Sequence, residues 1–388
     1  MGWTLTPEQS MLRDSAERYF REHYTFEKRR AALGAATGVE SETWRQFAEF
    51  GWLAAPFSEA DGGIGGGPAE AAIMMEAIGR SLVPEPYLPA VILCGGLLAA
   101  LGSDAQKQSS LQPLQEGTSV PALAFAEPQS RYDLNDCLST AREHDGGYLL
   151  NGHKTVVLGG AHASAYIVVA RTRGGQRSPD GLGLFFVPRA SKGLDITAYT
   201  TIDGSNACEL RLQDVRVGHD AVLGNPHEAA VALETIIDAG AAAVAAESLG
   251  AMAALLDLTL DYLKTRQQFG RPLGANQALQ HRLVDMHIAL EETRVLVAHA
   301  TASLESGDAD SRAKAVSAAK IQAGKAGRLI GQEAVQMHGA MGVTDESPVS
   351  HYFKRLTAID VCFGNASWHE QRFARLAFDA DVPIDQPA

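Results

Sequence analysis

The stretch that most restricts the fold is EAAVALETIIDAGAAAVAAESLGAMAALLDLTLDYLKTRQQF, residues 228–269, which is long, rich in alanine and apolar on more than one face. A helix of this kind must be covered on several sides, so it belongs inside a bundle. A second long helix is predicted from Asn276 and a third over about residues 311–338. The sequence therefore predicts a helical bundle for residues 226–388.

Two further blocks precede this bundle. Residues 119–225 contain short β-branched and aromatic runs separated by Gly, Asp-Gly and Pro, which predict a small β-barrel or sandwich. Residues 1–118 are predicted to be helical, with Thr6-Pro7-Glu8-Gln9 as a capping box with proline at N1, and with a second helix beginning at Ser41. A glycine run at residues 62–67 lacks the GxxxxGK[ST] pattern and predicts a tight loop before a helix. The predicted fold class is α+β with three domains.

Composition excludes several classes of protein. The chain has 33 Lys and Arg against 46 Asp and Glu, a net charge of −13, so it lacks the basic face of a nucleic-acid binder. Its four cysteines form no CxxC pair, which predicts no metal site and no disulfide framework. No stretch reaches 18 uninterrupted apolar residues, and the amino terminus has no signal-peptide core. We therefore expect a cytoplasmic protein without a membrane span.

Three motifs occur in order along the chain: LQDVRVGHDAVLG at residues 212–224, TRQQFGRPLGANQALQHRLVDM at 265–286 and AVQMHGAMGVTDESPVSHYFKR at 334–355. The second resembles RxxFGxPLxxxQxxQxxLAD and the third resembles QxxGGxGxxxExPVxxxxRD, both of the acyl-CoA dehydrogenase family. Each motif alone is weak, but together they give a resemblance to that family over nearly the full length.

The resemblance implies a helical domain, a central β-domain and a carboxy-terminal four-helix bundle, assembled as a dimer of dimers. It implies FAD between domains, with its adenosine end reaching the neighbouring subunit. It also implies removal of the pro-R α-proton of an acyl-CoA thioester by a carboxylate, with hydride transfer from Cβ to flavin N5. An electron-transfer flavoprotein is the implied electron acceptor.

Four positions match the family residues that serve the FAD of the adjacent subunit: Arg266, Phe269, Gln336 and Gly339. Arg266 can form a forked, charge-assisted pair with pyrophosphate, and Phe269 can cover the adenine or ribose. The alternative interpretations are a solvated charge for Arg266, a core aromatic for Phe269 and a plain helix C-cap for Gly339. For His338 we expect a helix-terminal role rather than acid–base chemistry.

The positions that serve a subunit's own flavin are altered. The family motif TEPxAGSD becomes AEPQSRYDLND, so Arg131 and Tyr132 replace the Gly-Ser step. The motif WITNG becomes VVLGG, so Val156 takes the tryptophan position and Leu158 the threonine position. A leucine side chain cannot hydrogen-bond flavin N5. These changes predict that binding of FAD in the chain's own site is impaired.

The catalytic carboxylate is missing from both positions where the family carries it. Phe363 takes the place of the glutamate in the family's YEGT, and Gly240, followed by Ala241, takes the alternative place on the long helix. Asp238 and Asp360 are possible substitutes, although a base must come within about 3 Å of its proton. The preferred interpretation is therefore the base-less subunit of a heteromeric α2β2 enzyme.

In that interpretation a paralogous subunit supplies the glutamate, as in bacterial family members that act on bulky acyl-CoAs such as steroid side chains. Two alternatives stay open from the sequence. One is a complete homomeric dehydrogenase with a relocated base. The other is a flavin-free protein that binds CoA thioesters or acts as a scaffold.

Overall fold

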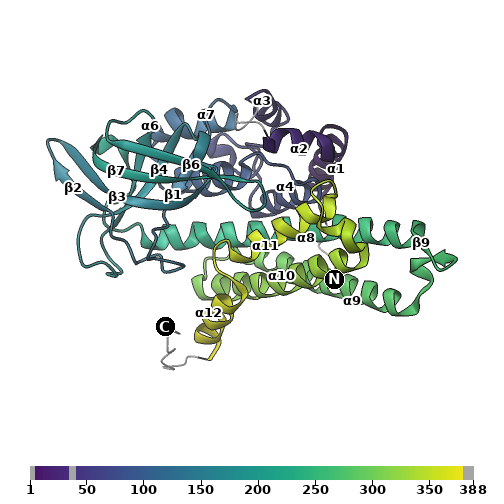
Figure 1. Cartoon of the computed structure of the whole chain (residues 1–388). Helices are drawn as coiled ribbons and strands as arrows, with labels where there is room; N and C mark the ends of the chain where they lie inside the picture. Colours follow the sequence, from purple (N-terminus) through teal and green to yellow (C-terminus); the bar gives the residue numbers. More distant parts are fainter. Residues whose placement is uncertain (1–4, 35–40, 379–388) are drawn as a thin grey trace. The chain divides into compact units, whose positions relative to one another are not determined.

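Figure 1 shows the computed structural model of the chain, which describes residues 5–34 and 41–378. Contacts divide the chain into two compact units. The first unit contains residues up to 28, residues 72–83 and the residues from 241 onward, and the second contains residues 29–71 and 84–240. The predicted order of helices, then strands, then helices is observed. The domain limits at residues 118 and 225 stay a prediction.

The amino-terminal elements are helical. Helix α1 (Pro7–His23) begins with the predicted capping box, in which Thr6 Oγ1 accepts from the Gln9 amide at 3.2 Å and Gln9 Oε1 accepts from the Thr6 amide at 3.0 Å. The other helical elements of this part are α2 (Phe26–Gly34), α3 (Ser41–Glu49), the 3-10 helix η1 (Glu59–Asp61), α4 (Pro68–Ser81), the π-helix η2 (Leu88–Gly95), α5 (Gly96–Leu101), α6 (Asp104–Gln106), the π-helix η3 (Lys107–Leu111) and α7 (Gln112–Gln115).

The glycine run before α4 is a tight loop, as predicted. A Cβ on Gly63 would lie 2.1 Å from the carbonyl oxygen of Phe57, and a Cβ on Gly66 would lie 2.1 Å from that of Ala55. The Gly67 amide donates to Glu70 Oε2 at 2.7 Å. The backbone therefore packs against itself here and Glu70 occupies the helix N-terminus, which leaves no cradle for a phosphate.

The strands of the second unit form one open sheet in the order β6-β7-β3-β2-β4-β5-β8, with β1 paired to β4. Because this path ends at β6 and β8 within the described residues, the barrel alternative is wrong and the sheet is sandwich-like. The strands are β1 (Pro121–Ala124), β2 (Thr140–His144), β3 (Gly147–Leu158), β4 (Ala165–Arg171), β5 (Leu182–Pro188), β6 (Leu194–Thr200), β7 (Asn206–Gly218) and β8 (Val222–Leu223).

The sheet's two halves share one apolar core. They meet at a single residue pair, Thr140 of β2 with Arg171 of β4. Buried side chains from both halves form the core, and the Tyr148 ring of β3 packs edge-on against the Phe185 ring of β5 with centroids 5.1 Å apart. This packing fixes where β3 and its neighbouring loop lie, and both matter for the site.

The long helices predicted from Asn276 and over about residues 311–338 are observed at Gln277–Ser303 and Ala309–His338. Helix α10 packs against α9, α11 and α12. A short hairpin of β9 (Gln267–Gln268) and β10 (Arg271–Pro272) separates the first two long helices. The helices are α8 (Ala230–Thr265), α9 (Gln277–Ser303), α10 (Ala309–His338), α11 (Pro348–Val361) and α12 (Ala366–Phe378).

Small residues allow α8 to be buried within the first unit. A Cβ on Gly250 would lie 1.8 Å from the carbonyl oxygen of Glu76 on α4, and a Cβ on Gly79 would lie 1.9 Å from that of Glu247 on α8. Helix α8 is long and apolar enough to cross a membrane, but 83% of its most apolar stretch is buried. This burial is what the alanine-rich sequence predicted.

Candidate functional site: a base position without a carboxylate

Phe363 occupies the loop between α11 and α12. Its side chain is 8% exposed, and its backbone has a φ of +57°, which is rare for an aromatic residue. The next residue, Gly364, has a φ of +109°, and a Cβ there would lie 2.5 Å from the Trp368 ring and 2.7 Å from His369 Nε2. The loop is thus a packed turn whose tip carries a buried hydrocarbon ring at the base position.

His369 holds this turn from α12. Its Nε2 lies 3.0 Å from the Phe363 carbonyl oxygen, so Nε2 carries the hydrogen and donates, while Nδ1 lies 3.1 Å from the Ser317 hydroxyl of α10. Burial, together with the nearby charges of Lys320 and Arg372, lowers the pKa of His369 to about 3. The imidazole is therefore neutral near pH 7, and its hydrogen bonds orient the turn.

Lys320 fixes the start of the same turn. The Nζ atom of this fully buried side chain donates to the carbonyl oxygens of Ile359 at 2.6 Å and Asp360 at 3.3 Å, at the end of α11. An ammonium group suits this place because the carboxyl end of a helix is electronegative. Burial lowers the pKa of Lys320 to about 8.

Asp360, one of the two possible substitute bases, is already engaged. Its Oδ1 accepts from the Ala366 amide at 3.3 Å, which caps α12, and its Oδ2 lies 3.2 Å from Arg328 Nη2. Asp360 is thus paired with Arg328 and caps a helix. The second substitute, Asp238, is buried in α8 two residues before Gly240. Gly240 itself is a buried residue of the same helix.

Arg266 and Phe269 belong to the hairpin that follows α8. Phe269 and Gly270 have φ values of +52° and +79°, as in a two-residue turn of type I′. The Phe269 side chain is 100% exposed, so the alternative of a core aromatic is wrong. Arg266 is also exposed, and its guanidinium forms no ion pair within the described residues. The hairpin therefore presents a cation and an aromatic ring to the surroundings.

Gln336 and Gly339 lie at the carboxyl end of α10. Gln336 is exposed, and Gly339 caps the helix with a φ of +62° and an amide that donates to the Gln336 carbonyl. His338 is the last residue of α10, where its Nδ1 lies 2.8 Å from the Ala334 carbonyl oxygen and its ring stacks on Tyr262 at 4.4 Å. This is the expected helix-terminal role.

The residues matched to the adenosine end of FAD and the turn of Phe363 lie at different places in the first unit. The stacked Tyr262 and His338 rings join the ends of α8 and α10, which brings Arg266 and Gly339 to the same end. The turn of Phe363 contacts α10 at Lys320, 19 residues before Gly339, or about 28 Å along the helix axis. The hairpin and the turn of Phe363 therefore lie too far apart in one chain to line a single site.

In the second unit a buried ion pair organises the AEPQSRYDLND segment. Glu127 Oε1 accepts from Lys154 Nζ at 2.7 Å and from the Ser139 amide at 3.0 Å, and Oε2 accepts from the Leu138 amide at 2.8 Å. Both charged side chains are at most 2% exposed. Burial alone would raise the pKa of Glu127, but mainly Lys154 lowers it to about 2.

The altered flavin positions lie next to this segment. The Thr155 amide donates to the Ala126 carbonyl at 3.0 Å, which places Val156 beside it. Val156 has a φ of +50°, an outlier for a β-branched residue, in an irregular stretch of the β3–β7 pairing, and 48% of its side chain is exposed. Arg131, at the motif's glycine position, has a φ of +47° and is exposed.

Val156, Leu158 and Ser130 offer no side-chain hydrogen bond to a flavin ring, whereas the hairpin carries groups that suit the other end of FAD. Val156 and Leu158 have no polar side-chain atoms, and the nearby Ser130 hydroxyl exchanges both its hydrogen bonds with the Glu127 backbone at 3.0 Å. The exposed Arg266 guanidinium and Phe269 ring suit a pyrophosphate and an adenine. The described residues also contain no cluster of three metal-ligating side chains.

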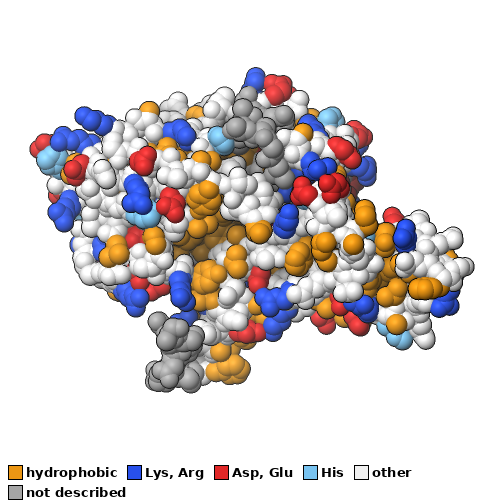
Figure 2. Space-filling view, in the orientation of Figure 1, with side chains coloured by type: hydrophobic (Ala, Val, Ile, Leu, Met, Phe, Trp, Pro, Cys, Tyr) orange, Lys and Arg blue, Asp and Glu red, His pale blue; other side chains and the backbone are white. Residues whose placement is uncertain are grey.

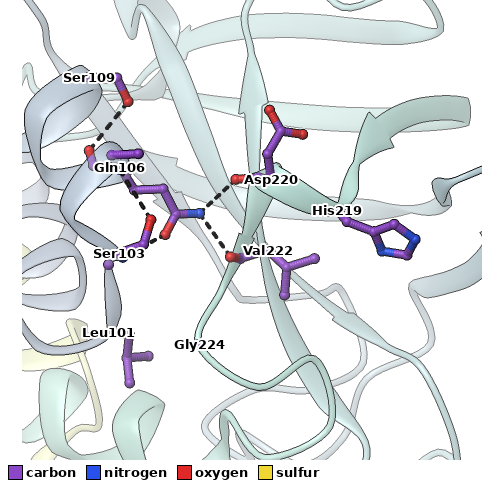
Figure 3. A pocket seen from close by; sticks show the side chains of 10 residues that line it. Leu101, Ser103, Gln106, Ser109, His219, Asp220, Val222 and Gly224 are labelled. Carbon is purple, nitrogen blue, oxygen red and sulfur yellow. Dashed lines mark hydrogen bonds between the residues drawn. The ribbon is translucent and has the colours of Figure 1, made fainter.

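One cavity of about 440 Å³ lies elsewhere in the second unit, and none of the predicted site residues lines it. Figure 3 shows the Gln106 side chain reaching across it to the segment that leads into β8, where Nε2 donates to the carbonyl oxygens of Asp220 at 2.7 Å and Val222 at 2.8 Å. Ser103 caps the short helix beside it. Gln106 thus satisfies two backbone carbonyl groups at the edge of the sheet with hydrogen bonds.

The chain belongs to the acyl-CoA dehydrogenase family. Models of the family's N-terminal, middle and C-terminal domains match residues 6–118, 122–215 and 229–377. The human mitochondrial short-chain specific acyl-CoA dehydrogenase is 31% identical over 80% of this chain and 76% of its own length. Among solved structures, the Tcur3481-Tcur3483 steroid ACAD aligns with a TM-score of 0.87 at 31% identity, covering 97% of this chain and 99% of its own.

A second solved structure is the ChsE4-ChsE5 complex from Mycobacterium tuberculosis. It aligns with a TM-score of 0.88 at 27% identity and covers 98% of this chain and 100% of its own. The chain thus has the family and the fold of FAD-dependent acyl-CoA dehydrogenases.

Proposed function

We propose that this chain is the base-less subunit of a cytoplasmic, heteromeric α2β2 acyl-CoA dehydrogenase. A paralogous subunit supplies the catalytic glutamate and the flavin-ring site, and this chain completes the adenosine end of that FAD. The observation that carries the proposal is Phe363, a buried aromatic ring in a turn held by His369 and Lys320 at the base position. That turn is well ordered by hydrogen bonds, yet it offers no proton acceptor.

FAD, when bound, accepts the hydride in the α,β-dehydrogenation of an acyl-CoA thioester. The residues of this chain bind and orient the adenosine end of that cofactor. The fork of Arg266 pairs with the pyrophosphate, and the Phe269 ring covers the adenine or ribose. Neither task requires the chain to hold a flavin ring of its own, which agrees with apolar side chains at Val156 and Leu158.

Exposed apolar side chains along α9, the helix that follows the hairpin, support a partner subunit on this face. Val284, Ile288 and Val295 of α9 are 54%, 49% and 58% exposed and share one face, opposite the buried face that includes Met286 and Thr293. Figure 2 shows apolar side chains on the surface around the end that carries β9. An apolar stripe of this kind marks a protein interface.

The two structural neighbours named above carry the names of two proteins each, and one is described as a steroid ACAD. They support a bulky acyl-CoA as the substrate class and a paired subunit as the partner. An electron-transfer flavoprotein is proposed as the electron acceptor. The alternative of a relocated base at Asp360 is disfavoured because that carboxylate caps α12 and pairs with Arg328.

The flavin-to-chain ratio tests this proposal. The chain purified alone is expected to be colourless, and co-expression with a glutamate-bearing paralogue is expected to give a yellow complex that oxidises acyl-CoA. A stoichiometric FAD spectrum in the isolated chain would contradict the heteromer.

Arg266→Ala is expected to weaken FAD binding by the complex about tenfold or more, because a hydrogen bond to a charged group contributes roughly 1.5–3 kcal/mol. The measurement is the dissociation constant of FAD from the purified complex. Lys264→Ala is the matched control, since Lys264 is an exposed cation at the end of α8. Equal affinities for the two variants would remove Arg266 from the cofactor site.

Phe363→Glu in the isolated chain is expected to give no measurable turnover of acyl-CoA with a dye acceptor. The reason is that the new carboxylate restores the base but leaves the apolar Val156 and Leu158 at the flavin ring. Phe363→Leu shows whether the turn tolerates substitution. Substantial activity of Phe363→Glu alone would mean that only the base was missing.

A further inference from the structure

Cys137, Lys154 and Glu127 form a buried triad in the second unit that the proposed function does not use. Lys154 Nζ lies 3.8 Å from Cys137 Sγ, and both groups bond to the same carboxylate oxygen, Glu127 Oε1, at 2.7 Å and 3.3 Å. The three residues are 3% exposed or less. An amine, a thiol and a proton acceptor thus meet in one place from which bulk water is excluded.

The chain's other two buried cysteines have no such neighbours. Cys94 and Cys208 are fully buried, and within the described residues no lysine forms a hydrogen bond with either of them. A packed thiol of this kind acts as a small hydrophobic residue. Cys137 differs because an amine and a carboxylate lie within reach of its sulfur.

We propose that Cys137 and Lys154 form a sulfur–nitrogen (sulfenamide) cross-link when the protein is exposed to hydrogen peroxide. Peroxide first converts the thiol to a sulfenic acid, releasing one water. The Lys154 nitrogen then attacks the sulfur, the S–N bond forms and the S–O bond breaks, and Glu127 takes the proton that the ammonium gives up. Cys–SH, Lys–NH₃⁺, Glu–COO⁻ and H₂O₂ become Cys–S–NH–Lys, Glu–COOH and two waters, a two-electron oxidation of sulfur.

Two physical reasons favour this outcome over further oxidation of the sulfur. A sulfenic acid condenses with a nearby nitrogen nucleophile, and the triad holds that nitrogen beside the sulfur at high effective concentration. The reaction also replaces a buried ion pair by neutral groups, which a low-dielectric interior favours. Burial raises the pKa of the Cys137 thiol, so the first step is slow and requires excess peroxide.

The cross-link would join two segments that lie beside the altered flavin positions. Cys137 directly follows the segment that Glu127 organises, and Lys154 lies two residues before Val156 on β3. The modification is expected to tie that segment to the sheet. It depends on the triad alone, so it stands whether or not the chain is a base-less subunit.

Peptide mapping of the peroxide-treated full chain tests the proposal. Trypsin cannot cut at a modified Lys154, so we expect the peptide of residues 132–142 joined to that of residues 143–171, with a mass 2 Da below the sum of the two peptides. Dithiothreitol should release the two peptides. Cys137→Ser and Lys154→Arg should each abolish the link, whereas Cys208→Ser should retain it.

The decisive measurement is the cross-linked peptide from the chain without substitutions, so a variant that fails to fold does not weaken the test. Oxidation of Cys137 to sulfinic acid without a link would overturn the proposal. So would an untouched Cys137 in protein whose more exposed Cys362 is fully oxidised, and so would a link that involves another lysine.

Discussion

Glu127→Ala is expected to lower the free energy of unfolding by about 3–5 kcal/mol, because it leaves the Lys154 ammonium buried without its counter-charge. The Leu138 and Ser139 amides lose their acceptor in the same change. The measurement is the denaturant midpoint of the full chain, followed by a signal from the second unit. Hydrogen exchange of the segment between residues 127 and 139 should rise most.

Two controls separate charge burial from the loss of a side chain. Glu143→Ala removes an exposed carboxylate from β2 of the same sheet and is expected to change stability by less than about 0.5 kcal/mol. The double variant Glu127→Leu with Lys154→Met removes both buried charges and should recover part of the loss. If Glu127→Ala and Glu143→Ala unfold at the same denaturant concentration, the ion pair does not organise this segment.

Lowering the pH from 7.5 to 5 is expected to cost about 2 kcal/mol of stability through His369 alone. The pKa of this imidazole is about 3 in the folded chain and near 6.5 when unfolded. Between pH 6.5 and 3 the unfolded state therefore binds a proton that the folded state does not bind. The free energy of unfolding falls as the pH drops through this range. Denaturant unfolding at several pH values measures the slope.

His369→Gln should flatten this dependence between pH 7.5 and 5, because glutamine does not titrate. His281→Gln replaces an exposed histidine of α9 and should leave the slope unchanged. Lys320 does not interfere, because its pKa of about 8 places its own effect at higher pH, where stability rises as the pH increases from 8 toward 10.5. An equal slope for the chain with and without His369→Gln would contradict the assignment.

Much of the fold could be predicted because its signals are local. The capping box at Thr6, the start of α9 after Asn276 and the end of α10 at His338 follow from residue type and periodicity. Strands β3 to β7 alternate or run apolar as strands do. The short strands β1 and β2 and the hairpin of β9 and β10 were missed because their few residues show no period. Closure of the sheet was also undecided, since it depends on which strands pair.

The candidate site also has features that the sequence predicted and features that it did not. Compared with the family's motifs, the residue types at positions 363, 240, 156 and 158 predict that the expected carboxylate and hydroxyl are missing. No sequence signal pointed to His369, Lys320 or the partnership of Glu127 with Lys154, because their partners are backbone carbonyls or residues far away in the chain. For this pair the only hint in the sequence was the charged residue Lys154 within the largely apolar strand β3.

Residue type and periodicity thus predicted the three-part order and the buried character of α8, because both are properties of the chain itself, and the resemblance to the family placed Phe363 where a base is expected. Tertiary structure decided that Phe269 is exposed while Phe363 is buried, that Asp360 is occupied by Arg328 and α12, and that Cys137 lies beside Lys154. These outcomes depend on burial and on contacts between distant segments. Both arise only when packing decides which groups lose water and which groups meet.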